Sequence, residues 1–448
     1  MIDNMSARLK RMTRMKWLIG GLSLLGFIVL GAGLHLVSGR ARIVPDRELL
    51  GELAEAEFLE SPPTLADSWP GWLGPSRDGV VSFPQLNRKW QSGPALRHKL
   101  PGGDGYSSFA VRGKWAWTLI ADDNREVVVC LDLNLGSEKW RRPYLLQQTF
   151  DYSGPRSTPL LVDNDLFAVL SDGQVIAVDA ETGAERWVSR LKATPPRWGF
   201  AHSPLLVGNK LFIGPAVFDR ADGRETWNLS DVQPGYSSPV RAVISGVEQV
   251  IWFNGTHLVG VQPKRDSYEE LWRFRWDTFS NVNAATPLVI PARQEMRDLA
   301  YVFISSGYGK GCAVVRVTRE GGTFTARPVY ESSDLCCHFA SPVRRGEYVY
   351  GLDETRDLTC MNLRTGQIAW RQRGFRKGSL IRVDDCLLIL GENGNLALAE
   401  ATPESYRPIA MARPFRDRCW SLPALADGVL MLRDRKTIQI FEMAKGSD

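Results

Sequence analysis

Few residues in this chain of 448 have the types and spacing that enzymatic chemistry requires. The sequence contains no G-x-S-x-G motif, no H-E-x-x-H motif and no phosphate-binding glycine loop, and its five histidines are not clustered. The chain contains one adjacent cysteine pair, Cys336–Cys337, but no compact set of acidic residues accompanies it and Asp334 is the nearest. We interpret the pair as two thiols in a loop or as a disulfide with a structural role.

A second group of residues is better suited to binding. Aromatic and basic side chains gather just before the Ser-Pro and Thr-Pro steps that recur along the chain, and these types are enriched at binding hot spots. The alternative is that they only satisfy backbone carbonyls at a pore. We predict a funnel that binds a ligand or partner with an anionic or peptide component, formed by Tyr106, Tyr152, Arg156, Arg197, Trp198, His202, Tyr236, Asn283, His338, Arg376, Lys377, Arg418 and Trp420.

The elements that must position these residues form a repeat of about 45 residues. Its clearest copy, residues 157–187, reads as four short strands separated by turns rich in Asn, Asp and Gly. The copy near Tyr330 lacks the closing tryptophan that most other copies share. We predict that each of these rings wedges between neighbouring sheets: Trp140, Trp187, Trp227, Trp272 and Trp370.

A single four-stranded sheet cannot bury both of its faces, so such sheets stack around an axis. We predict an all-β fold, an eight-bladed β-propeller of four-stranded antiparallel blades, preceded by an N-terminal transmembrane helix. The last copy, residues 422–443, holds three strands at most, and residues 94–100 are predicted to supply the fourth and close the ring.

This topology explains why the funnel residues would meet. The segment that joins the outer strand of one blade to the inner strand of the next crosses one rim of the ring toward the axis. Loops on a rigid scaffold are a common place for binding residues. Eight such crossings are expected, at residues 102–106, 151–156, 196–202, 233–236, 279–283, 334–338, 375–377 and 414–420.

The N-terminus resembles a membrane anchor. Residues 17–37 are apolar and uncharged, long enough to cross a hydrocarbon core, and basic residues precede them. We predict a cytoplasmic tail at 1–16, a transmembrane helix at 17–37, and a single-pass protein of the bacterial inner membrane with its propeller on the periplasmic side. A cleaved signal peptide is the alternative.

Between the anchor and the ring, residues 38–68 are predicted to form a linker that contains a short helix within 46–60, followed by a Ser-Pro-Pro spacer. The propeller is predicted to occupy residues 69–448. No long basic run is present, so nucleic acid is not expected as a partner.

The repeats resemble those of the pyrroloquinoline-quinone (PQQ) family of β-propellers. Residues 177–187 (AVDAETGAERW) look like the end of such a repeat, and residues 69–79 (WPGWLGPSRDG) are similar to the lead-in before many of these propellers. The resemblance implies one of two branches: BamB-like propellers, which bind proteins during outer-membrane protein assembly without a cofactor, or quinoprotein dehydrogenases, which hold PQQ and calcium.

The chain is about as long as eight blades require, with few insertions, and this favours the BamB-like branch. The lipid-acceptor cysteine of BamB is absent, however. We therefore predict a binding scaffold for a protein or ligand, possessing neither a catalytic residue nor a metal or cofactor and acting in envelope protein assembly. A PQQ-dependent oxidoreductase with calcium is the alternative. A carbohydrate- or polymer-binding module is a third reading, which has no sequence feature of its own.

Overall fold

Alternating apolar residues and short polar turns fold the chain into successive β-meanders. The clearest repeat forms β10 (Leu160–Val162), β11 (Asp165–Val169), β12 (Gln174–Asp179) and β13 (Glu185–Arg190), each paired antiparallel with the next. The computed structural model describes residues 46–90, 92–229, 232–264, 267–294, 297–354 and 357–444.

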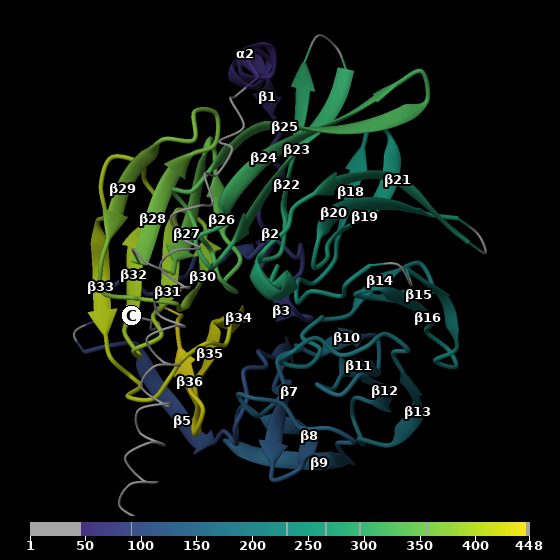
Figure 1. Ribbon diagram of the computed structural model, residues 1–448. Helices are drawn as coiled ribbons and strands as arrows, with labels where there is room; N and C mark the ends of the chain where they lie inside the picture. The colour runs from purple at the N-terminus through teal and green to yellow at the C-terminus, as the bar shows by residue number, and fades with distance from the viewer. Residues whose placement is uncertain are drawn as a thin grey trace, which may run out of the picture. The chain divides into compact units, whose positions relative to one another are not determined.

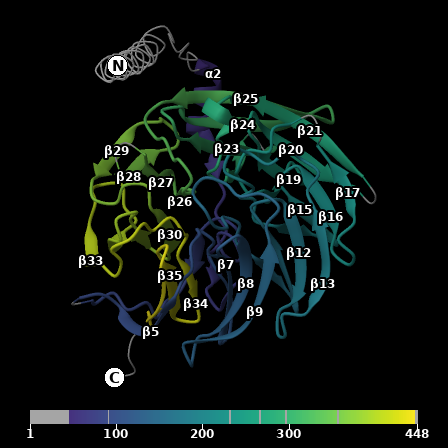
Figure 2. The same ribbon diagram turned by 60° about the horizontal axis from the view of Figure 1, so that its bottom comes forward.

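The described strands lie in eight sheets, which follow one another in chain order around a central axis (Figures 1 and 2). Sheets of the same simple type as β10–β13 are formed by β14 (Leu205–Val207), β15 (Lys210–Ile213), β16 (Ala216–Asp219) and β17 (Glu225–Asn228); by β18 (Val240–Ile244), β19 (Val247–Phe253), β20 (His257–Pro263) and β21 (Tyr268–Arg275); and by β26 (Val343–Arg345), β27 (Tyr348–Asp353), β28 (Asp357–Asn362) and β29 (Ile368–Gln372).

Three other sheets carry additional strands from the N-terminal part of the chain. They are β1 (Glu57–Phe58) on β22 (Leu288–Gln294), β23 (Arg297–Ser306), β24 (Gly311–Glu320) and β25 (Thr323–Ser332); β3 (Ser68–Trp69) on β6 (Ala110–Arg112), β7 (Trp115–Asp122), β8 (Arg125–Asp132) and β9 (Ser137–Leu145); and β2 (Thr64–Leu65) with β4 (Val80–Ser82) on β30 (Ser379–Val383), β31 (Cys386–Leu390), β32 (Leu396–Glu400) and β33 (Pro408–Ala412).

These additions correct the predicted fold class. The prediction of four-stranded antiparallel blades throughout is wrong, because β2 pairs with β4, and β4 with β30, in the parallel sense. The inner strand of each sheet presents an unpaired edge toward the axis, and such edges accept further strands. Residues 57–58 and 64–65, predicted to be linker, therefore hydrogen-bond to sheets of the ring.

The predicted N-terminal membrane anchor is also corrected. The tail (1–16) and the proposed transmembrane helix (17–37) lie outside the described residues. Among the residues that the structure describes, no helix combines the length and apolar character needed to cross a bilayer. The single-pass anchor and the inner-membrane location are therefore not supported and are not retained.

The ring closes where its two ends meet in one sheet, as predicted. β34 (Ala424–Ala426), β35 (Val429–Arg433) and β36 (Thr437–Glu442) come from the C-terminal end, and β5 (Ala95–Pro101) pairs antiparallel with β36. Arg433, which is fully buried, reinforces this junction by donating to the carbonyl oxygens of Leu119 and Gly102, each at 2.9 Å.

The core lies between adjacent sheets, so each middle strand buries both of its faces. In β11, Leu166 and Ala168 pack toward the preceding sheet, whereas Phe167 and Val169 pack toward the following one. The strand period of two sends neighbouring residues to opposite faces. This explains why the middle strands read as continuous apolar runs.

The closing tryptophans Trp140, Trp187 and Trp370 bond across a sheet boundary as predicted, whereas the indole N–H of Trp272 donates to Gln249 within its own sheet. The indole N–H of Trp187 donates to the carbonyl oxygen of Arg220 in the next sheet at 3.0 Å. A Cβ at Gly223, which has φ +71°, would lie 2.4 Å from this indole, so the turn requires glycine. In the copy that lacks tryptophan, the Tyr330 hydroxyl donates to the carbonyl oxygen of Leu363 at 2.8 Å and takes over the same role.

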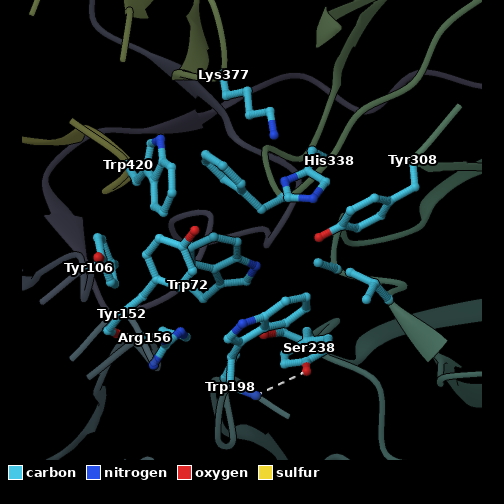
Figure 3. Close-up of a pocket in the computed structure, with 15 residues that line it drawn as sticks. Trp72, Tyr106, Tyr152, Arg156, Trp198, Ser238, Tyr308, His338, Lys377 and Trp420 are labelled. Atoms are coloured by element: carbon cyan, nitrogen blue, oxygen red, sulfur yellow. Dashed lines mark hydrogen bonds between the residues drawn. The ribbon is translucent and has the colours of Figure 1, made fainter. Parts of the chain in front are cut away.

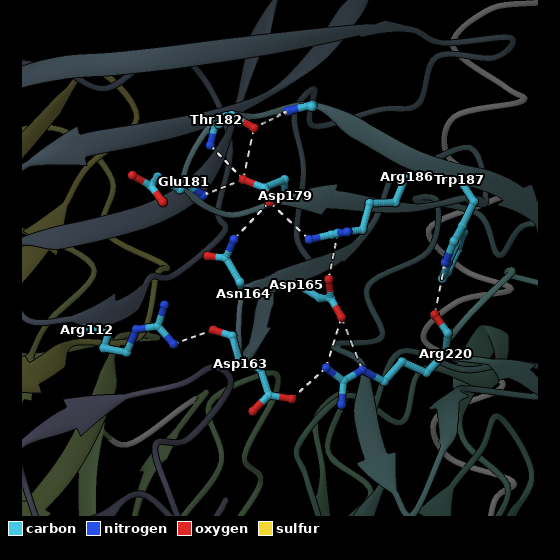
Figure 4. A network of polar contacts seen from close by, with 11 residues as sticks. Arg112, Asp163, Asn164, Asp165, Asp179, Glu181, Thr182, Arg186, Trp187 and Arg220 are labelled. Atoms are coloured by element: carbon cyan, nitrogen blue, oxygen red, sulfur yellow. Dashed lines mark hydrogen bonds and ion pairs between the residues drawn. The ribbon is translucent and has the colours of Figure 1, made fainter.

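Charged residues tie the same two sheets together beside the Trp187 wedge (Figure 4). Arg220 contacts Asp163 at 2.7 Å and Asp165 at 2.9 Å across the sheet boundary. Arg186 bridges Asp165 at 2.7 Å and Asp179 at 3.0 Å within its own sheet. These pairs are partly exposed, so they align the sheets more than they stabilise them.

The predicted short helix is present as α2 (Arg47–Glu55). Asp46 caps it by accepting from the backbone N–H of Glu48 at 3.0 Å. Leu49 and Leu53 are buried on one face, and the helix ends at Glu55, earlier than the predicted segment.

Candidate functional site

A cavity of about 240 Å³ opens where the segments that cross toward the axis converge (Figure 3). It receives at least one side chain from each of the eight predicted crossings. The predicted funnel residues in its wall are Tyr106, Tyr152, Arg156, Trp198, Tyr236, His338, Lys377 and Trp420. The fold therefore brings together residues that are more than 300 positions apart in the chain.

Two of the predicted funnel residues lie inside the protein rather than in the cavity wall. His202 is fully buried; its Nε2 lies 3.2 Å from the carbonyl oxygen of Pro234, and burial lowers its pKa to about 4. Asn283 is fully buried as well, and its amide donates to the carbonyl oxygen of Asn254 at 2.8 Å. Both side chains hold neighbouring backbone segments in place.

The three remaining predicted residues are cations outside the cavity wall. The guanidinium of Arg418 lies 4.4 Å from the ring centroid of Trp420, and that of Arg197 lies 5.4 Å from the ring of Trp198. Arg376 directly precedes Lys377 and adopts a left-handed backbone conformation, with φ +55°. Arg418 and Arg197 therefore contact aromatic rings of the cavity wall, and Arg376 is next to the wall residue Lys377 in the chain.

Sequence reasoning missed several residues of the wall. Phe339 directly follows the predicted His338, and Tyr308 comes from the turn between β23 and β24, which is not a crossing segment. Trp72 belongs to the N-terminal lead-in, whose motif gave no indication that it enters the ring. The other missed residues are small or apolar: Ala201, Ser238, Val282 and Ala284.

Trp72 lies in the middle of the cavity lining. Figure 3 shows it surrounded by the other labelled side chains. Its indole N–H donates to the hydroxyl oxygen of Thr286 at 2.9 Å, which sets the orientation of the ring.

The mouth of the cavity has exposed aromatic rings. Tyr152 is 54% exposed, Tyr308 41% and Phe279 67%, and the rings of Phe279 and Tyr308 lie 5.8 Å apart. Tyr152 and Tyr308 have left-handed backbones, with φ +58° and +56°. Such conformations are costly for bulky side chains and occur preferentially at ligand-binding positions.

The charged groups of the wall are basic. Arg156 donates to the carbonyl oxygens of Gly154 at 3.0 Å and Tyr152 at 2.6 Å, and burial lowers its pKa. Lys377 has no ion pair with any described residue, and its side chain is directed toward His338 (Figure 3). Among the described residues, no aspartate or glutamate lines the cavity.

His338 is a neutral polar group in this wall. Neither ring nitrogen has a hydrogen-bond partner among the described residues, and both atoms are buried. Burial lowers the pKa of His338 to about 4, and the nearby charge of Lys377 lowers it further in the same direction. At neutral pH the ring is therefore uncharged.

The wall does not fit a calcium-dependent quinone site. Calcium takes carboxylate, amide and carbonyl oxygen ligands, and alcohol oxidation needs a base, yet the cavity has no acidic side chain. The described residues contain no group of three or more His, Cys, Asp or Glu side chains placed to hold a metal. All seven cysteines are buried and unbridged, and Cys336 and Cys337 lie outside the cavity wall.

Solved structures share this architecture at low sequence identity. Quinohemoprotein alcohol dehydrogenase from Comamonas testosteroni matches with a TM-score of 0.64 and 11% identity, over 90% of this chain and 84% of that one. A europium-containing methanol dehydrogenase matches with a TM-score of 0.63 and 12% identity, over 86% of this chain and 91% of that one. BamB from Moraxella catarrhalis matches with a TM-score of 0.53 and 14% identity, over 78% of this chain and 100% of that one.

At these identities the structural likeness establishes the fold alone. No curated protein has a significant sequence match to the chain. A profile of PQQ-type repeats, described as outer membrane protein assembly factor BamB, matches residues 89–216 and 124–372, which together span more than half of the sequence. The chain belongs to this BamB-like family of PQQ-type β-propellers.

Proposed function

We propose that this protein is a non-catalytic binding module, and that its cavity receives an apolar ring and an adjoining anionic group from a protein partner. The observation that carries the proposal is the composition of the wall, which is aromatic and contains two cations and no carboxylate. An aromatic wall favours a ring, and the ammonium of Lys377, which pairs with no carboxylate in the described part of the chain, favours an anion.

The size of the cavity supports a side chain as the occupant. At about 240 Å³, the cavity is smaller than the roughly 300–1,000 Å³ of common cofactor and drug sites. The exposed rings of Tyr152, Phe279 and Tyr308 extend the apolar surface beyond the mouth. A partner that inserts one side chain would also cover these rings, as expected for a hot spot surrounded by weaker contacts.

The family supports a protein partner as well. The profile that matches the chain is named for an outer membrane protein assembly factor, and we extend that role to this protein as part of the proposal. Two of the solved structures are alcohol or methanol dehydrogenases. We do not extend their activity to this chain, because the described lining of its cavity includes no acidic residue to act as a base or to bind calcium.

The proposal is tested with full-length protein and an array of short peptides in which an aromatic residue is flanked by Asp, Asn or Lys. Wild-type protein is expected to select the Asp-flanked peptides. Lys377→Glu is expected to weaken that binding by about tenfold or more, because a like charge replaces the attractive one.

Arg224→Glu provides the matched control, because Arg224 is an exposed cation in the turn before β17, outside the cavity wall. This variant is expected to bind as wild type does. The proposal would be contradicted if the affinity did not depend on the charge of the flanking residue, or if Lys377→Glu did not change it. Dye-linked alcohol oxidation after addition of PQQ and calcium would establish the dehydrogenase alternative.

A further inference from the structure

The N-terminal lead-in enters the ring as a loop. Residues 69–80, called here the axial loop, leave the inner edge of one sheet at β3 and return along the inner edge of another at β4. In Figure 1 the neighbouring strands β2 and β3 lie near the centre of the ring. The chain thus occupies its own axial channel.

Hydrogen bonds attach the axial loop to sheets on several sides of the axis. The carbonyl oxygen of Pro70 accepts from the backbone N–H of Leu161 in β10, and that of Gly79 accepts from Arg382 in β30, each at 2.8 Å. Trp72 donates to Thr286, which lies two residues before the start of β22. A loop with attachments on opposite sides of a channel cannot move along it as a unit.

Arg77 supplies the strongest attachment. Its guanidinium donates to the carbonyl oxygens of Pro204 at 2.7 Å, Pro239 at 3.0 Å and Ser203 at 3.2 Å, which lie at the inner ends of two adjacent sheets. Charge-assisted hydrogen bonds of this kind are stronger than neutral ones.

The axial loop contains a tight turn with an unusual backbone conformation. Leu73 and Gly74 have consecutive left-handed conformations, with φ +61° and +76°. A Cβ at Gly74 would lie 2.9 Å from the ring of Trp69, so this tight turn requires glycine. The turn follows directly after Trp72, and therefore sets the position at which the indole meets the cavity.

We infer that the axial loop is an internal plug and that Trp72 is the specificity-determining residue of the cavity, because its indole limits how far an occupant's ring can enter. This inference rests on the proposed function and adds the element that selects the occupant. Thr286 and Arg77 act as positioning residues, since one orients the indole and the other holds the loop that carries it.

The experiment measures binding of three carboxylates of increasing ring length to full-length protein: phenylacetate, 2-naphthylacetate and 4-biphenylylacetate. Titration calorimetry or ligand-observed NMR gives their relative affinities. Wild-type protein is expected to favour phenylacetate or 2-naphthylacetate over 4-biphenylylacetate. Trp72→Ala is expected to raise the affinity for 4-biphenylylacetate relative to phenylacetate by about tenfold or more, a change of about 1.4 kcal/mol.

Trp72→Phe and Thr286→Val keep the test decisive if the alanine variant does not fold. Trp72→Phe shortens the ring and is expected to shift the preference in the same direction by a smaller factor. Thr286→Val retains the indole but removes the hydrogen bond that orients it, so it is expected to shift the order of affinities less than either Trp72 variant does.

The outcomes separate the two proposals. If the carboxylates bind in a Lys377-dependent manner but neither Trp72 variant changes the order of affinities, the plug inference is wrong and the proposed function stands. If none of the three binds wild-type protein at millimolar concentration, the proposed cavity function is wrong and the inference fails with it.

Discussion

Arg77 donates a hydrogen bond to the carbonyl oxygen of Pro204 at 2.7 Å in the interior of the ring, where no carboxylate of the described residues pairs with it. Burial lowers the pKa of Arg77 to about 9, so the side chain remains cationic at neutral pH. The carbonyl oxygens at the inner ends of two sheets compensate for its lost hydration.

Removal of this guanidinium should destabilise the fold. Arg77→Met is expected to lower the free energy of unfolding by roughly 2–4 kcal/mol, because buried carbonyls lose charge-assisted partners. Equilibrium urea unfolding measures the change. Arg77→Lys retains the charge but not the forked geometry, and should recover only part of the loss.

Arg88→Met is the control for this variant. Arg88 forms an ion pair with Asp385, but both side chains are 42% exposed. The expected change in the free energy of unfolding is therefore within about 0.5 kcal/mol. Equal effects of the two substitutions would show that Arg77 is not a special anchor of the axial loop.

A buried carboxyl group should make stability depend on pH. Glu126 in β8 is fully buried; one oxygen accepts from the backbone N–H of Ser171 at 2.9 Å and the other has no partner among the described residues. Burial raises the pKa of Glu126 to about 7. Below pH ~4.5 the group is protonated in both the folded and unfolded states, so its ionisation does not change the free energy of unfolding.

Between pH ~4.5 and ~7 the unfolded chain loses this proton while the folded protein keeps it, so stability falls as pH rises. Above pH ~7 the ionised, buried carboxylate lowers the free energy of unfolding by its full amount, about 3 kcal/mol. Glu126→Gln has no such cost. The difference in unfolding free energy between the variant and wild type should grow from near zero at pH ~4.5 to about 3 kcal/mol at pH ~8.

Urea unfolding of both proteins across this range tests the prediction. Other buried groups, such as His202, titrate in both proteins and cancel in the difference. Curves for the two proteins that run parallel from pH ~4.5 to ~8 would mean that Glu126 does not have a raised pKa in the folded state.

The histidine of the cavity should stay neutral well below its ordinary titration range. His338 is expected to titrate near pH 4, mainly because of burial and secondarily because of Lys377. Its ring resonances, assigned by their loss in His338→Asn, give the pKa by NMR titration. Lys377→Met should raise this pKa, since a repelling charge is removed, while burial keeps it below the usual value of about 6.5.

Arg376→Met is the matched control, since it removes the same charge from the neighbouring position outside the cavity wall. It should change the pKa of His338 less than Lys377→Met does. Titration of His338 at or above its ordinary value in the wild-type protein would show that the ring is solvated rather than buried.

The sequence by itself determined the elements whose partners are close in the chain. Alternating residues and Asn, Asp and Gly turns define each meander, because a hairpin pairs neighbouring strands. The repeated tryptophans predicted the wedge of Trp187, and the incomplete last copy predicted that β5 would pair with β36. The same periodicity placed eight of the predicted funnel residues in one cavity wall.

The tertiary structure alone decided what fills the axis. Trp72 and Arg77 belong to a segment outside the repeat, and their partners lie on inner strands that are distant in sequence and become neighbours only when the ring closes. His202 and Asn283 show the same limit, because a position in a crossing segment does not reveal whether a side chain faces the cavity or the core. Local pattern specifies strands and turns, whereas the direction of each side chain at the axis depends on how all the sheets meet there.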